Sequence, residues 1–297
     1  MRSQVTGSDV SIVKVTVFTK HEMFLSPKLL LCNTPVSPMQ IITLTTDLGT
    51  RDHYVGSVKG ALLSAIPDAL IIDISHDIEP FNILHAAFVL KNCYADFPKG
   101  TIHIIGVNSF HDSETGILVV KHEGYFFIGP DNGLFGLMWE EKMPAEIFKL
   151  KLNEEEMKST LPLHDAYVRT TKEISARGNP SAIAEKINGF RVRVMAKPVI
   201  SDQFLRGSII YFDRFGNAVV NIQRNEFESL LNGKRFTIIF KRYSDIESIS
   251  ENYSAVEESE KLCFFNSSGY LELAINKGNA KQLLNLAQGD VVQIEFH

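Results

Sequence analysis

Between residues 40 and 107 the pattern of apolar and polar positions switches several times between that of a strand and that of a helix. The β-rich run at 40–46 is followed by apolar residues that recur at a spacing of four from Tyr54 to Ile66, as on one face of a helix. The apolar run at 69–74 predicts a buried strand. The expected elements are strand, helix, strand, helix and strand, over residues 40–46, 54–66, 69–74, 80–97 and 101–107. This order predicts parallel strands joined by right-handed crossovers.

The pattern changes after Gly178-Asn179-Pro180 to short alternating strands separated by turn residues. Several such strands in succession are typical of a small antiparallel sandwich or barrel. The predicted fold class is an α/β N-terminal domain with a mainly parallel sheet, plus a C-terminal antiparallel β-barrel-like domain. The predicted domains are an N-terminal extension of uncertain structure, the α/β domain and the β-barrel-like domain, over residues 1–38, 39–190 and 191–297.

Composition and charge exclude several classes of partner. The chain has 297 residues and a formal net charge of −5, with its lysines and arginines scattered, so nucleic acid and anionic membranes are not expected as partners. No apolar run approaches the roughly 20 residues of a membrane helix. The three cysteines, Cys32, Cys93 and Cys263, are far apart, which indicates reduced thiols in a cytoplasmic protein and matches no metal motif.

Two polar residues follow predicted parallel strands. Asp47 ends the first strand and Asn108 follows the third. Ligands of such sheets bind beyond the carboxyl ends of the strands, where a carboxylate can accept the hydroxyls of a ribose. On spacing alone, Asp47 is better explained as a turn or helix-capping aspartate.

A second candidate lies on a predicted hairpin of the C-terminal domain. Asp213, Phe215 and Asn217 place a carboxylate, an aromatic face and an amide on one turn. These groups suit an ammonium, a stacked purine and the edge of that purine. A plain hairpin with one buried phenylalanine is the alternative.

Five motifs in order make the pattern specific. They are Thr43-Leu44-Thr45-Thr46-Asp47-Leu48-Gly49, Tyr54-Val55-Gly56-Ser57-Val58-Lys59-Gly60, Pro130-Asp131-Asn132-Gly133, Asp213-Arg214-Phe215-Gly216-Asn217 and Asn266-Ser267-Ser268-Gly269-Tyr270-Leu271-Glu272. Together they resemble the S-adenosylmethionine hydroxide adenosyltransferases, the adenosine-forming hydrolases related to fluorinase and chlorinase. The resemblance covers roughly residues 39 to 297.

The resemblance implies a homotrimer with S-adenosylmethionine bound between neighbouring subunits, and no cofactor or metal. Asp47 would hold the ribose hydroxyls, with Phe81 against the ribose. In the C-terminal domain the implied substrate contacts are Asp213 to the methionine ammonium, Phe215 stacked on adenine, Asn217 at the adenine edge, and Ser267 and Ser268 near the methionine carboxylate or adenine.

The residues that activate water in the family are replaced in this chain. Asn108 stands in place of an aspartate, Thr115 in place of an arginine and Pro162 in place of a histidine. An asparagine can orient water but cannot accept its proton near neutral pH. Neighbouring replacements are His111, Asp112, Glu114 and His164, and the candidate catalytic residues are Asn108, His111 and Asp112.

Three functions remain open. The first is a hydrolase that cleaves S-adenosylmethionine at C5′ to adenosine and methionine by in-line attack of water. The second is a protein that binds or senses the same ligand without turnover. The third is a halide-using adenosyltransferase, which the short turn at 121–125 and the asparagine at position 108 disfavour.

Overall fold

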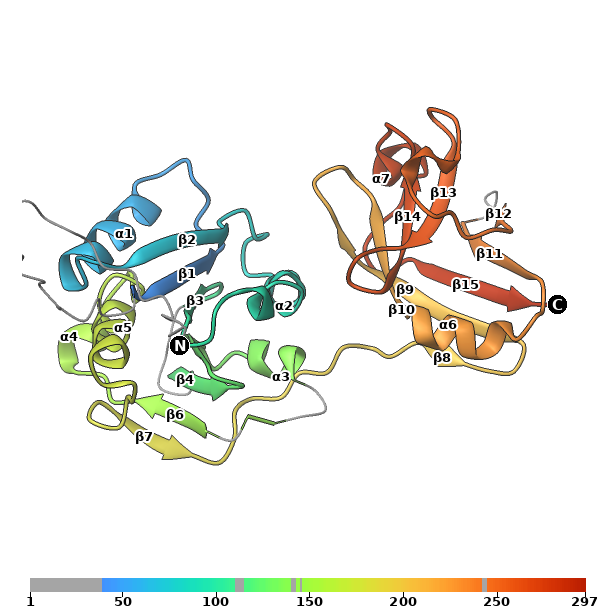
Figure 1. Cartoon of the computed structure of the whole chain (residues 1–297). Coiled ribbons are helices and arrows are strands. Elements are labelled where there is room, and N and C mark those ends of the chain that lie inside the picture. The colour runs from blue at the N-terminus through green and yellow to red at the C-terminus, as the bar shows by residue number, and fades with distance from the viewer. Residues whose placement is uncertain (1–38, 110–114, 140–142, 145, 242–244) are drawn as a thin grey trace, which may run out of the picture. The chain divides into compact units, whose positions relative to one another are not determined.

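The computed structural model describes residues 39–109, 115–139, 143–144, 146–241 and 245–297. The N-terminal domain contains a seven-stranded sheet of order β2-β1-β3-β5-β4-β6-β7 (Figure 1). The strands are β1 (Ile41–Thr46), β2 (Leu70–Ser75), β3 (Ile102–Gly106), β4 (Ile117–His122), β5 (Tyr125–Pro130), β6 (Glu146–Leu150) and β7 (Ala184–Ile187). β1 pairs in parallel with β2 and β3, and β3 with β5, whereas β4, β6 and β7 are joined by antiparallel pairings. The predicted α/β domain with a parallel core is therefore confirmed.

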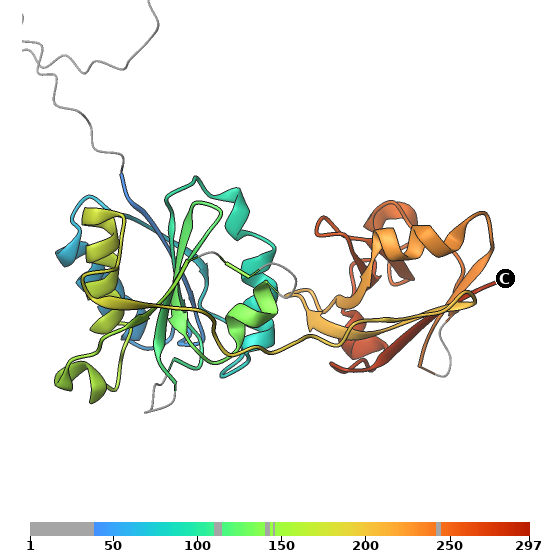
Figure 2. The same cartoon turned by 90° about the horizontal axis from the view of Figure 1, so that it is seen from below.

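Helices cover both faces of this sheet, as Figure 2 shows from below. They are α1 (Tyr54–Ala65), α2 (Ile83–Lys91), the 3-10 turn η1 (Tyr94–Asp96), α3 (Leu134–Met138), α4 (Glu154–Met157) and α5 (Ala166–Arg177). Val58 and Leu62 of α1 share one apolar core with Tyr167 of α5. Leu90 of α2 and Phe135 of α3 belong to a second core on the opposite face. Burial on both faces explains why the central strands are continuous apolar runs.

Two elements differ from their predictions. The strand β2 was expected to be buried, but its residues are half-buried or exposed, because β2 is the edge strand of the sheet and has only β1 beside it. The helix expected over 80–97 begins later, at Ile83, since Asn82 caps it by accepting the backbone N–H of His85. Phe81 lies before this cap in a left-handed conformation with a φ of 65°.

The C-terminal domain is an antiparallel sheet of order β12-β11-β15-β9-β10-β14-β13, with β8 beside β9. Its strands are β8 (Val199–Ile200), β9 (Phe204–Phe212), β10 (Ala218–Gln223), β11 (Phe236–Phe240), β12 (Asp245–Ile246), β13 (Lys261–Phe265), β14 (Tyr270–Ile275) and β15 (Val291–Phe296). Three short helical segments join them: α6 (Arg224–Leu231), η2 (Tyr253–Ala255) and α7 (Ala280–Leu283). Inward side chains such as Leu205, Val220 and Ile294 form one core. The predicted antiparallel, barrel-like domain is confirmed.

Candidate ligand-binding site

The strand order of the first domain reverses direction between β1 and β3, because the chain passes from β1 outward to β2 and then returns to β3 on the other side. In open parallel sheets such a reversal leaves a crevice at the carboxyl ends of the two strands, where ligands bind. Asp47 follows β1 at this point and Asn108 lies two residues after β3. The sheet topology therefore places both predicted residues at one crevice.

The carboxylate of Asp47 organises the loops around it. Its Oδ2 accepts the backbone N–H of Phe81 at 2.9 Å and that of Asn108 at 3.1 Å. Both donor residues have positive φ, 65° and 47°, which is uncommon for residues other than glycine. Neither donor uses Oδ1, so one carboxylate oxygen holds the two loops while the other is left for a ligand.

The turn Pro130-Asp131-Asn132-Gly133 fastens two further segments to this crevice. The side-chain amide of Asn132 donates to the carbonyl oxygens of Val107 and Asn108, at 3.1 and 3.3 Å. Asp131 Oδ1 accepts the backbone N–H of Arg191 at 2.7 Å. The motif is thus more than a turn: it ties the loop after β3 to the segment after β7.

A cavity of about 350 Å³ opens at this place. We call it the switch-point cavity, and its lining residues are Phe81, Ile83, Asn108, Thr115, Asn132, Arg191 and Arg193. The ring of Phe81 is 63% exposed, which leaves its face available for a ligand. Of the predicted catalytic residues, Asn108 lines the cavity, whereas His111 and Asp112 lie outside the described residues.

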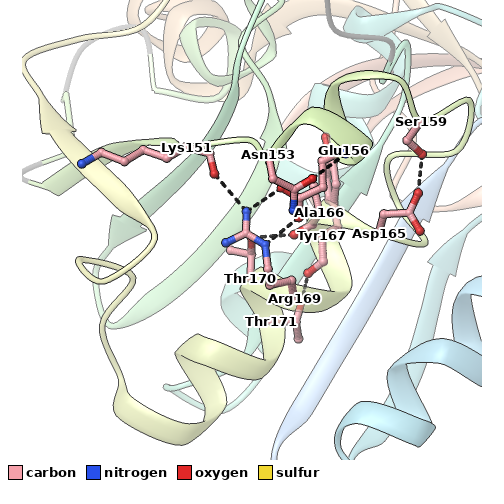
Figure 3. Close-up of polar contacts among 10 residues, drawn as sticks. All are labelled: Lys151, Asn153, Glu156, Ser159, Asp165, Ala166, Tyr167, Arg169, Thr170 and Thr171. Atoms are coloured by element: carbon pink, nitrogen blue, oxygen red, sulfur yellow. Dashed lines mark hydrogen bonds and ion pairs between the residues drawn. The ribbon is translucent and has the colours of Figure 1, made fainter.

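Pro162 stands where the resemblance predicts a histidine. The residues around it belong to a separate polar cluster (Figure 3). Arg169 makes a bidentate ion pair with Glu156, at 2.5 and 2.9 Å, and also donates to the carbonyl of Lys151. Asp165 accepts hydrogen bonds from Ser159 and from His164, the latter at 2.9 Å. Partial burial alone raises the pKa of Asp165, but these hydrogen bonds hold it below its usual value. Glu156 and Arg169 thus satisfy each other, and Asp165 is satisfied by Ser159 and His164, so these groups hold the start of α5.

The hairpin between β9 and β10 carries the second predicted group. Asp213 Oδ1 accepts the backbone N–H groups of Phe215 and Asn217, at 2.9 and 2.8 Å. Gly216 has a φ of 84°, and a Cβ on it would lie 2.3 Å from Asn279 Oδ1. Only glycine fits there. The ring of Phe215 is left 74% exposed at the tip of this turn.

Asn217 belongs to a chain of hydrogen-bonded polar side chains. Its Nδ2 donates to Asp213 Oδ2 at 2.9 Å and to Tyr253 Oη at 3.2 Å, and Tyr253 donates to Glu272 Oε1 at 2.8 Å. Asn266 donates to the other oxygen of Glu272 at 3.0 Å. Both donor positions of Asn217 are therefore used, which leaves its Oδ1 as the atom that can accept from a purine amino group.

Glu272 is a carboxylate on a fully buried strand. It is 5% exposed within β14. Burial raises the pKa of Glu272 above its usual value, and the charge of Asp213 adds to that effect, while hydrogen bonds from Asn266 and Tyr253 oppose it. Burial and the neighbouring Glu272 likewise raise the pKa of Tyr253. Tyr253 and Glu272 are joined by a hydrogen bond, and the pKa of each is raised.

A larger cavity, about 570 Å³, lies beside this network. We call it the hairpin cavity, and its lining residues are Phe215, Asn217, Tyr253, Ile275, Asn276, Lys277, Gly278 and Asn279. Ser267 and Ser268 are not among them; Ser267 is exposed, and the backbone N–H of Ser268 donates to Asn266. The structure thus joins Phe215 and Asn217 in one cavity and leaves the two serines outside its lining.

Sequence reasoning missed Tyr253, Arg193 and the role of Glu272. A charged residue between Leu271 and Leu273 in a strand of apolar residues was a usable signal for Glu272. Tyr253 begins the short 3-10 helix η2 and Arg193 lies in a segment between the domains, and no local pattern marks either of them.

The chain combines two domains that are each suited to one part of a nucleoside. The α/β domain has a carboxylate at its switch point, and the antiparallel domain has an exposed phenylalanine beside an amide. These features define a class of two-domain, nucleoside-binding proteins. Family models for the N-terminal and C-terminal domains of SAM hydroxide adenosyltransferase match residues 42–184 and 207–293. The chain belongs to the SAM hydroxide adenosyltransferase family.

The similarity to known proteins covers nearly the whole length of each relative. The (R)-S-adenosyl-L-methionine hydrolase of Methanocaldococcus jannaschii is 32% identical over 87% of this chain and 97% of its own. The fluorinase of Nocardia brasiliensis is 25% identical over 86% of this chain and 96% of its own. The crystal structure of an uncharacterized conserved protein from Thermotoga maritima superposes with a TM-score of 0.77, at 28% identity over 86% of this chain and 99% of that one.

Proposed function

We propose that this protein hydrolyses S-adenosyl-L-methionine at C5′ to adenosine and L-methionine. The observation that carries the proposal is the carboxylate of Asp47, which is held at the switch point by the backbone N–H groups of Phe81 and Asn108. One of its oxygens is left to accept ribose hydroxyls. Family membership and the relatives named as S-adenosyl-L-methionine hydrolases support the same substrate.

The chemistry requires alignment more than activation of the substrate. The water oxygen attacks C5′ in line with the C5′–S bond; as that bond breaks, its electron pair passes to sulfur, which leaves as the neutral thioether of methionine. One proton of the water is released. The sulfonium is already a good leaving group, so no further cofactor or metal is needed, and the protein contributes positioning and a site with little water.

Each binding residue has a distinct part in this proposal. Asp47 holds the ribose hydroxyls and Phe81 packs against the sugar. Phe215 stacks on adenine, and Asn217 Oδ1 accepts from the adenine amino group. Asp213 has three of its roughly four acceptor positions filled and offers the last to the methionine ammonium.

The water site contains Asn108 in place of a base. Its side-chain amide lines the switch-point cavity and can orient the attacking water by hydrogen bonding. The proposal also assigns Ser267 and Ser268 to the methionine carboxylate or adenine, although neither lines the hairpin cavity, and it retains His111 and Asp112 as candidate bases.

The direct test is product analysis. Purified protein incubated with S-adenosyl-L-methionine, with and without chloride or fluoride, should release adenosine and methionine in equal amounts. Binding by calorimetry without any product would favour a sensing protein, and a 5′-haloadenosine would favour a halide-using transferase. Asn108→Ala should lower kcat more than it weakens binding, because Asn108 faces the nucleophile and not the nucleoside.

The two cavities are further proposed to meet between subunits of a homotrimer, in a protein of the cytoplasm. Free thiols at Cys93 and Cys263 support a reducing compartment. Within the described ranges, no helix combines the length and apolar character needed to cross a bilayer. If the site is shared between subunits, mixing inactive Asp47→Ala and Phe215→Ala proteins should restore activity through hybrid sites, and light scattering should give three chains per particle.

A further inference from the structure

The switch-point cavity is rich in positive charge. Among the described residues its lining contains two charged side chains, Arg191 and Arg193, while the carboxylate of Asp47 lies next to the lining, bonded to the backbone of Phe81 and Asn108. The other polar members are the neutral side chains of Asn108, Thr115 and Asn132. A small pocket with this lining favours an anion over a cation.

Arg193 is placed in this cavity by the turn that the family motif supplies. Gly133 has a φ of 98°, and a Cβ there would lie 2.6 Å from Arg193 Cγ. A Cβ on Gly136 would lie 2.8 Å from the backbone nitrogen of Arg193. The hydrogen bond from the backbone of Arg191 to Asp131 holds the same segment. The arginine therefore packs on two glycines where no larger residue fits.

The two arginines differ in their partners. Arg191 is engaged by its backbone and by a further interaction. Among the residues that the structure describes, no carboxylate lies within ion-pair distance of Arg193. Arg193, which is exposed and lines the same cavity as Asn108, therefore has an unpaired guanidinium that is the cation most available to a ligand in the cavity.

We propose that Arg193 stabilises the attacking water as hydroxide, and so acts as a catalytic residue of this chain. The inference rests on the proposed hydrolysis. Water in the cavity loses a proton to the solvent, the guanidinium holds the resulting hydroxide, and the O–C5′ bond forms as the C5′–S bond gives its electron pair to sulfur. Because Asn108 cannot take the proton, a cation that lowers the pKa of the water supplies what a base would otherwise provide.

The kinetic signature follows from the charges. A guanidinium attracts hydroxide but repels the sulfonium of the substrate, so Arg193 contributes to turnover and not to ground-state binding. Arg193→Gln should lower kcat by about 100-fold, as loss of one preorganised charge donor does elsewhere, with no increase in KM. The rise of kcat with pH should move to higher pH in the variant, because more alkaline conditions are needed to form hydroxide.

The experiment compares Arg193→Gln, Arg193→Lys and the distant Arg235→Gln. Arg235 lines a separate cavity near the C-terminus with Phe236 and His297 and serves as the matched control. The lysine variant should recover part of kcat, since it restores the charge without the planar geometry. Equal loss of kcat in Arg193→Gln and Arg235→Gln would overturn the inference, as would a weakened KM with unchanged kcat, which would assign Arg193 to substrate binding. Thermal melts of all variants test whether any loss of kcat comes from a folding defect.

A second measurement separates this inference from the proposed function. Chloride serves as a stand-in anion, and its exchange with the protein is followed by the width of the ³⁵Cl resonance with adenosine present. Broadening that disappears in Arg193→Gln but not in Arg235→Gln would support the anion site even if the wild-type protein released no adenosine. Normal hydrolysis by Arg193→Gln would leave the proposed function intact and remove Arg193 from it. Absence of Arg193-dependent broadening together with an unchanged pH profile would also overturn the role.

Discussion

The two cavities of this protein are held together by different kinds of contact. At the switch-point cavity one carboxylate oxygen of Asp47 gathers the backbones of Phe81 and Asn108. At the hairpin cavity side chains hold side chains, from Asp213 through Asn217 and Tyr253 to Glu272. The first arrangement depends on a single anionic acceptor, whereas the second spreads the same task over several neutral and acidic groups.

This difference has consequences for tolerance to change. Loss of a lone acceptor leaves two backbone donors unpaired and frees two loops of positive φ at once. Loss of one member of a network leaves the remaining hydrogen bonds in place. The switch-point cavity should therefore be the more fragile one, and the hairpin cavity the more sensitive to pH.

The largest expected effect is that of Asp47→Ala. The variant removes the ribose acceptor and the partner of two backbone N–H groups, so affinity for S-adenosyl-L-methionine should fall by about 100-fold or more, given the cost of losing charged hydrogen bonds. Asp47→Asn keeps an acceptor for the loops and should retain more of the melting temperature than of the affinity. Calorimetry and thermal melts measure the two separately. Unchanged affinity in Asp47→Ala would end the ribose assignment.

Gly133→Ala should come next. It places a Cβ at a φ of 98° and against the side chain of Arg193, so it should cost about 2 kcal/mol of unfolding free energy. Gly100→Ala is the matched control, because Gly100 has a similar φ of 89° and open space around it. At Gly100 only the backbone strain of a positive φ remains, and it should cost about 1 kcal/mol of unfolding free energy. Equal losses in urea unfolding would show that Arg193 does not pack on this turn.

Tyr253→Phe should have a smaller effect. It removes the hydroxyl between Asn217 and Glu272, which should cost about 1 kcal/mol of stability and up to about tenfold in affinity. Tyr54→Phe is a suitable control, since Tyr54 is 41% exposed and Tyr253 is 42% exposed. A loss of affinity as large as that of Asp47→Ala would show that the remaining hydrogen bonds around Asn217 and Glu272 do not preserve the hairpin cavity.

The smallest effect should be a pH trend at Glu272. Because burial raises the pKa of Glu272 in the folded state, its ionisation costs more in the folded than in the unfolded protein. That penalty is absent below the ordinary value of 4.5 and grows as pH rises from there through the folded pKa. Wild-type protein should therefore lose stability relative to Glu272→Gln over that rise. A difference in melting temperature that stays constant with pH would contradict the raised pKa.

Periodicity predicted most strands well because buried strands carry a local signal. The strands predicted at 40–46 and 101–107 agree with β1 and β3 to within one residue at each end. The burial of β2 was predicted wrongly, since an edge position depends on which strands pair and not on the residues of that strand. The start of α2 was missed because the cap at Asn82 competes with an apolar pattern that continues before it.

The candidate site divides in the same way. Asp47, Phe215 and Asn217 could be proposed from the sequence because each belongs to a short motif whose residue types suit one part of a nucleoside. Tyr253 and Arg193 were not, because each reaches its cavity through contacts with residues far away in the chain.

The sequence by itself determined the order of strands and helices, the two domain types and the motifs that assign the chain to its family, since these depend on residues close together in the chain. Only the tertiary structure decided that Asp47 serves two loops at once, that Glu272 is buried behind Asn217, and that Arg193 lies over Gly133. The physical reason is that burial and charge pairing arise from long-range contacts, whose partners no local pattern identifies.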